Sequence, residues 1–62
     1  MHKIAEFKAE NGKKTKVYWN ADYSEYVVRF FNHKGVHMDA SDYFTNDKKD
    51  ALNTAKIAVE AR

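Results

Sequence analysis

The sequence has 62 residues, a formal net charge of +2 and no cysteine. Its length allows one domain with a small core, and the absence of cysteine excludes disulfide bridges and zinc sites built on thiolates. No apolar run reaches the roughly 20 residues of a membrane span and the N-terminus lacks a signal-peptide core. We therefore expect a cytoplasmic protein that makes no membrane contact.

The N-terminal third predicts a β-hairpin. Residues 3–9 and 14–20 have the composition of strands and flank Asn11-Gly12, a pair typical of a two-residue type I′ turn. This loop would place Phe7 opposite Lys16. A short amphipathic helix is the alternative for the first of these segments, but the strand is favoured because the helical pattern fits no better.

The densest β-forming run follows at residues 25–31. Five of its seven residues are β-branched or aromatic, and a loop rich in turn formers precedes it. Pairing Trp19 with Tyr26 places Val17 opposite Val28. We expect this run to be the central strand.

A short loop and a fourth strand are predicted next. Residues 32–35 fit a type I turn closed by Gly35 in the left-handed region. The register of that turn predicts a strand over residues 36–39, with Phe31 beside His37. Turn-forming residues then end this strand.

The C-terminal segment predicts a helix over residues 46–61. Thr45-Asn46 would cap it, and Asp47 and Asp50 suit the positive end of the helix dipole. The apolar residues that recur at helical spacing are Ala51, Leu52, Ala55, Ala58 and Val59. The predicted fold is therefore α+β, a meander of three or four antiparallel strands with one helix across one face.

Alternation along the strands sorts the side chains into two sets. The set expected beneath the helix is Ile4, Val17, Trp19, Tyr26, Val28, Phe30, Val36 and Met38. The set expected on the open face, the sheet face that the helix does not cover, is Phe7, Lys14, Lys16, Tyr18, Val27, Arg29, Phe31 and His37. Cations and aromatic rings alternate in the second set, so we expect any binding site to lie on the open face.

Three interpretations of the open face stay open. It could be a solvated surface, a protein interface that buries Tyr18, Val27 and Phe31, or a nucleic-acid site with cations on phosphates or base edges and rings for stacking. We predict a small non-enzymatic binding module with nucleic acid as the leading specific ligand. A homodimer or an adaptor or inhibitor module is the alternative. The candidate binding residues are Lys14, Lys16, Tyr18, Arg29, Phe31 and His37.

Two families share parts of this pattern. The stretch from Tyr26-Val27-Val28-Arg29-Phe30-Phe31 to Asp47-Lys48-Lys49-Asp50-Ala51 resembles the β-meander and helix of AP2-type and integrase arm-binding domains. Such domains lay the exposed sheet face in the DNA major groove. The resemblance implies DNA contacts for Lys16, Tyr18 and Arg29.

The C-terminal half is also similar to the end of a double-stranded-RNA-binding domain, through Lys48-Lys49-Asp50-Ala51 and Thr54-Ala55-Lys56-Ile57-Ala58. That likeness implies that Lys48 and Lys49 hold phosphates. The first helix of that family has no counterpart in this sequence. In size and composition the chain also resembles small phage-encoded accessory proteins.

No catalytic or cofactor motif is present in the sequence. Both serines lie in predicted turns outside any G-x-S-x-G context, and both glycines are assigned to turns rather than to a phosphate loop. His33 and His37 have a metal-binding spacing for a helix, but they fall on a predicted turn and strand. We therefore predict no enzyme, no cofactor and no metal site.

Overall fold

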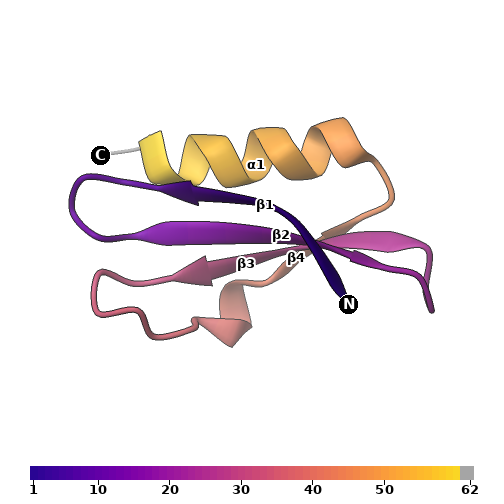
Figure 1. Cartoon of the computed structure of the whole chain (residues 1–62), viewed down its shortest axis with the longest axis horizontal. Helices are drawn as coiled ribbons and strands as arrows, with labels where there is room; N and C mark the ends of the chain where they lie inside the picture. The colour runs from indigo at the N-terminus through magenta and orange to yellow at the C-terminus, as the bar shows by residue number, and fades with distance from the viewer. Residues whose placement is uncertain (61–62) are drawn as a thin grey trace.

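A computed structural model describes residues 1–60. The chain forms strands β1 (His2–Lys8), β2 (Lys14–Asn20), β3 (Glu25–Phe31) and β4 (Tyr43–Thr45), a 3-10 turn (Asp39–Ser41) and helix α1 (Lys48–Glu60). The strands form one antiparallel sheet in the order β1-β2-β3-β4, and α1 lies along one face of it (Figure 1). The predicted α+β meander with one C-terminal helix is confirmed. Residue 61, which the sequence assigned to the helix, lies outside the described residues.

Strands β2 and β3 pair as predicted from the sequence. Trp19 lies opposite Tyr26, Val17 opposite Val28, and the remaining pairs follow without a bulge. The predicted register holds because both strands are seven residues long and rich in β-branched and aromatic side chains. These two strands therefore form the fixed centre of the sheet.

The first segment is a strand, β1, and not the alternative short helix. The turn predicted for the first hairpin is wrong. Only Gly12 of the Asn11-Gly12 pair has a positive φ, so a type I′ turn is absent. The amide of Gly12 donates a hydrogen bond to the carbonyl of Ala9, and the amide of Ala9 donates one to the carbonyl of Lys13. The loop is thus a type I turn closed by a left-handed glycine, one residue longer than predicted.

The longer loop changes the face on which Phe7 lies. Phe7 pairs with Thr15 instead of Lys16, and it packs against the core beneath α1 rather than on the open face. A β-bulge at Ile4 then shifts the register again toward the N-terminus, where Lys3 pairs with Tyr18. Phe7 was therefore predicted on the wrong face, whereas Ile4 packs against the core as predicted.

The second loop has the predicted geometry. The amide of Gly35 donates to the carbonyl of Asn32, and Gly35 has a φ of 82°. The side-chain Oδ1 of Asn32 also accepts hydrogen bonds from the amides of Lys34 and Val36. As predicted, this loop sets Phe31 beside His37.

The fourth strand is not at residues 36–39, where the sequence placed it. That segment makes a single bridge through His37, after which the chain turns through Asp39–Ser41 and forms β4 at Tyr43–Thr45. Val36 and Met38 are consequently 57% and 38% exposed instead of buried beneath the helix.

The core lies between α1 and the two central strands. Val17 and Val28 from the sheet and Ala51 and Ala55 from the helix are fully buried, and each valine contributes roughly 1.5–3 kcal/mol by its burial. The alanines let the helix lie close to the sheet. The buried hydroxyl of Thr15 donates to the carbonyl of Ala55 at 3.0 Å, which identifies the face of β2 that the helix covers.

The helix starts two residues later than predicted, at Lys48 instead of residue 46. Asp47, rather than Thr45-Asn46, caps the helix, because its Oδ1 accepts hydrogen bonds from the amides of Lys49 and Asp50. Thr45 Oγ1 in turn accepts from the amide of Asp47. No helix within residues 1–60 is long and apolar enough to cross a membrane.

Candidate binding face

The open face consists of the outward side chains of β1 to β4. Its residues are Lys3, Glu6 and Lys8 from β1, Lys14, Lys16, Tyr18 and Asn20 from β2, Glu25, Val27, Arg29 and Phe31 from β3, and Phe44 from β4. His37 extends this face, because it bridges to Phe31. Antiparallel pairing aligns these side chains in rows across the strands, where directly opposed Cβ atoms lie about 5 Å apart.

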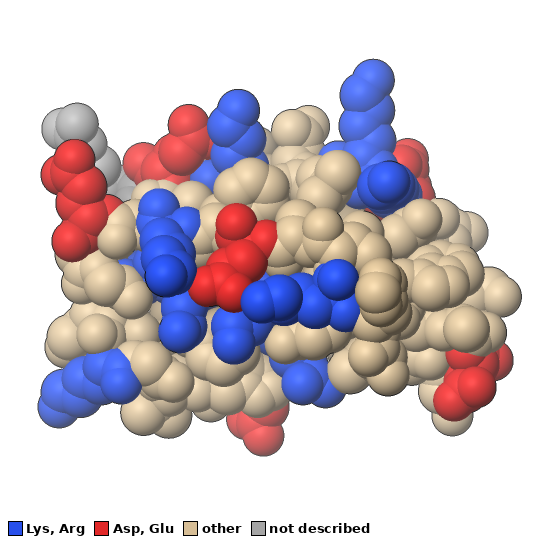
Figure 2. Space-filling view, viewed as in Figure 1, with Lys and Arg blue, Asp and Glu red and all other residues tan. Residues whose placement is uncertain are grey.

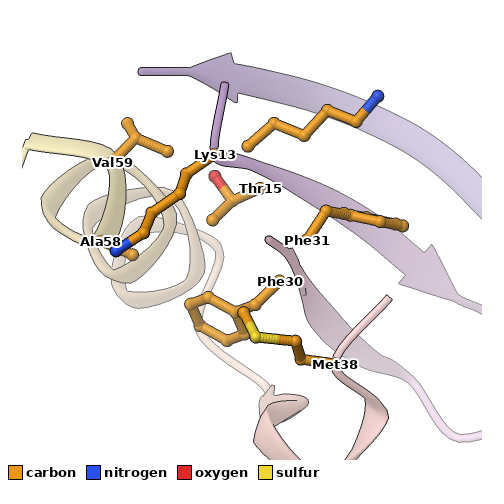
Figure 3. A pocket seen from close by; sticks show the side chains of 8 residues that line it. Lys13, Thr15, Phe30, Phe31, Met38, Ala58 and Val59 are labelled. Carbon is orange, nitrogen blue, oxygen red and sulfur yellow. The ribbon is translucent and has the colours of Figure 1, made fainter. Parts of the chain in front are cut away.

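All six candidate binding residues of the sequence lie together on this face. Lys14 lies opposite Phe31, Lys16 opposite Arg29, and Tyr18 opposite Val27. The candidates were placed correctly because the β2–β3 register was predicted correctly. Figure 3 shows Thr15 and Phe30 turned toward the helix and Phe31 turned away from it.

Two lysines cover the ring of Phe31. Lys16 Nζ lies 4.9 Å and Lys14 Nζ 5.7 Å from the ring centroid. Each such cation–π contact is worth about 0.5–1 kcal/mol at an exposed site. The contacts place both ammonium groups within about 6 Å of the same ring centroid.

Arg29 covers the ring of Tyr18 in the same way. Its guanidinium carbon lies 5.0 Å from the ring centroid. Arg29 Nε is buried and has no hydrogen-bond partner among the described residues. The guanidinium is therefore held by packing against the ring, and part of its hydrogen-bonding capacity is unused.

His37 is fixed at the edge of the face by two contacts. Its ring lies 5.2 Å from that of Phe31, and its Nε2 is 2.8 Å from Asp42 Oδ1. When the imidazole is protonated, this contact is an ion pair. Asp42 thus offsets a positive charge on His37, which makes His37 a weaker anion ligand than the neighbouring lysines.

The sequence did not identify the charged residues of β1 on this face. Glu6 accepts a hydrogen bond from Lys3 at 2.8 Å, and Lys8 Nζ lies 3.9 Å from its other oxygen. The hydrogen bond with Lys3 holds the pKa of Glu6 below its usual range and raises that of Lys3. Glu6 and Lys8 were missed because the hairpin was predicted one residue too short.

Phe44 was also missed. It pairs with Val27 and is 57% exposed, whereas Val27 itself is buried at 2% between Tyr18 and Phe44. The run Tyr43-Phe44-Thr45 has the composition of a short strand, and that signal was available in the sequence. The open face thus has an apolar row beside its cations.

Positive charge concentrates on the open face. Strands β1 to β3 place five cations and two carboxylates there, while the rest of the sequence carries six basic and seven acidic residues. Figure 2 shows basic side chains crowded around a small acidic patch near the centre of the view, where β1 passes in front in Figure 1. The open face therefore carries a net positive charge of its own although the net charge of the chain is small.

Lys48 and Lys49 do not join this group. They lie exposed at the start of α1, on the other side of the sheet, and Asp47 and Asp50 flank them. Tyr43 Oη donates a hydrogen bond to Asp50 at 2.6 Å, so one of these carboxylates is already engaged. The two lysines form a separate, partly neutralised candidate.

The hollow beside the end of α1 is smaller than a typical ligand pocket. A hollow of about 120 Å³ opens between the end of α1 and the sheet, where Lys13 leans toward Ala58 and Met38 lies beside Phe30 (Figure 3). Ligand pockets usually measure at least about 300 Å³. Within residues 1–60 no three metal-binding side chains gather into a site.

Comparisons with protein-family models, curated proteins and solved structures gave no significant match.

Proposed function

We propose that this chain is a small non-enzymatic module that binds nucleic acid through its open face. The observation that carries the proposal is the charge asymmetry, with five cations and two carboxylates on one sheet face. Cations that neutralise phosphates release condensed counterions, and this release supplies most of the sequence-independent affinity for nucleic acid.

Packing of the cations favours this function. Lys14 and Lys16 lie over Phe31, and Arg29 lies over Tyr18. Long side chains that are already ordered lose less conformational entropy when they meet a ligand. The aromatic rings thus act first as supports that hold cations ready for phosphates.

The alternative is a homodimer that buries Tyr18, Val27 and Phe31. Face-to-face packing of two copies would bring five cations of one copy against five of the other, and like charges brought together cost free energy. Val27 is already buried within one copy and would add little apolar area. An anionic partner fits the face better than a second copy.

The test compares two matched charge reversals. The variant Lys14→Glu/Lys16→Glu changes the open face, and Lys48→Glu/Lys49→Glu makes the same charge change on the helix side. Arg29 is left intact because its Nε is buried. Fluorescence anisotropy with labelled mixed-sequence oligonucleotides at about 50 mM salt measures binding.

We expect the open-face variant to lose binding and the helix variant to keep most of it. Amide spectra of both variants should show that they are folded. Equal losses in the two variants would assign the effect to net charge, and loss in the helix variant alone would move the site to the start of α1. Sedimentation of the wild type at rising concentration tests the homodimer.

A further inference from the structure

The three aromatic rings of the open face differ in what covers them. Lysines lie over Phe31 and an arginine over Tyr18, so a flat ligand must displace a cation to stack on either ring. Phe44 is 57% exposed, and within residues 1–60 no Lys or Arg lies over its ring. Of the Phe and Tyr rings on this face within residues 1–60, Phe44 is therefore the one that no cation covers.

Phe44 also lies within reach of the cations. It pairs with Val27, and Arg29 lies two residues further along the same strand. Such diagonal neighbours in an antiparallel pair lie roughly 7–8 Å apart. Lys16 lies opposite Arg29 on the next strand. A ligand that meets these cations with its anionic groups can place an adjoining flat group on Phe44.

Few ligands combine closely spaced negative charges with exposed aromatic rings. A double helix turns its phosphates outward and keeps its bases stacked inside, so it could use the cations but not the ring. A single strand offers both phosphates and unpaired bases, and aromatic side chains bind such bases by stacking. An acidic peptide offers the charge but no regular series of rings.

We propose that Phe44 is a base-stacking residue and that the ligand of the open face is a single-stranded nucleic acid. This inference rests on the proposed function. Phosphates lie on Lys14, Lys16 and Arg29, and one base lies flat on Phe44. Because stacking tolerates every base, we expect little sequence preference.

The test uses Phe44→Ala, Phe44→Trp and the control Tyr23→Ala. Tyr23 is a 75% exposed ring in the turn between β2 and β3, so its removal deletes an exposed aromatic side chain elsewhere. Each protein is titrated into a labelled single strand of about 12 nucleotides, as DNA and as RNA, and into the corresponding duplexes.

We expect Phe44→Ala to bind the single strand more weakly by roughly 5- to 140-fold, which corresponds to the loss of one stacked base. Duplex binding should be unchanged, Phe44→Trp should restore single-strand binding, and Tyr23→Ala should behave as wild type. A Phe44→Ala variant that binds single strands as wild type does, or a wild type that prefers duplex, would overturn the assignment of Phe44.

Failure of the broader function has a different signature. If the wild type binds neither single strands nor duplexes at low salt, both proposals are wrong. If it binds and Lys14→Glu/Lys16→Glu abolishes binding while Phe44→Ala does not, the open face keeps its function and only the stacking role is lost. Concentration-dependent association that Phe44→Ala removes would instead identify Phe44 as a self-association contact.

Discussion

Glu6 is one of the two carboxylates on the open face and lies among its cations, so its removal should strengthen the proposed binding of anions. It lies between Lys3 and Lys8, and its hydrogen bond with Lys3 holds its pKa below the usual range. The substitution Glu6→Gln removes this charge and leaves a side chain of similar size. The variant Glu60→Gln makes the same change in net charge at the exposed end of α1.

The expected salt dependence of the affinity follows from the charges on the open face. In the proposed complex Lys14, Lys16 and Arg29 would make three phosphate contacts, and Lys3 and Lys8 with Glu6 would add one more net charge. For single strands, about 0.7 counterions are released per contact, so the affinity should fall about 50-fold when salt rises from about 50 to about 200 mM. With Glu6→Gln, a fifth charge raises this fall to about 130-fold.

Affinity at low salt should also rise. A unit charge about 7 Å from a phosphate costs about 0.6 kcal/mol in water before screening, so its removal should tighten binding about two- to threefold. Anisotropy titrations of the wild type, Glu6→Gln and Glu60→Gln over a salt series measure both the affinity and the slope. The reasoning is refuted if Glu6→Gln weakens binding or matches Glu60→Gln in slope.

Two further predictions concern stability. Gly12 and Gly35 both have positive φ, so alanine at either position should cost about 1–3 kcal/mol, and Gly12→Ala should cost more because its Cβ would lie 3.0 Å from the carbonyl oxygen of His33. Urea unfolding measures both losses, and equal values would contradict the second part. The hydrogen bond to Asp50 raises the pKa of Tyr43 above its ordinary value of 10.0. The stabilisation that this hydrogen bond gives the folded protein is therefore complete below pH 10, and it is lost as pH rises through the raised pKa of Tyr43. The difference in unfolding free energy between wild type and Tyr43→Phe should shrink over that range, and a constant difference would exclude this linkage.

The centre of the sheet was predictable because local and long-range signals agree there. Strands β2 and β3 are both dense in β-forming residues, and a single register pairs their apolar positions. The Asn11-Gly12 turn was not predictable in the same way, because an Asn-Gly pair fits both a type I′ turn and a type I turn that ends in a left-handed glycine. The amide of Lys13 donates to Asn11 Oδ1, a local bond that accompanies the second form.

A one-residue difference in that loop changed the composition of the open face as well as the core. It moved Phe7 into the core and brought Lys8 and Glu6 to the open face. Side chains alternate with a period of two, so a single added residue exchanges the two faces of a strand. Sequence reasoning therefore found the cations of β2 and β3 and missed the charges of β1 that modulate them.

The position of β4 explains why Phe44 was missed and why the ring is open. Residues 36–39 favour a strand by composition, but Asp39–Ser41 forms a 3-10 turn after one bridge, and strand pairing resumes only at Tyr43. This delay leaves β4 three residues long at the edge of the sheet. Phe44 therefore has a neighbouring strand on one side only. A ring at a sheet edge, next to supported cations, can be approached from above and from the side, and an interior ring such as Phe31 cannot.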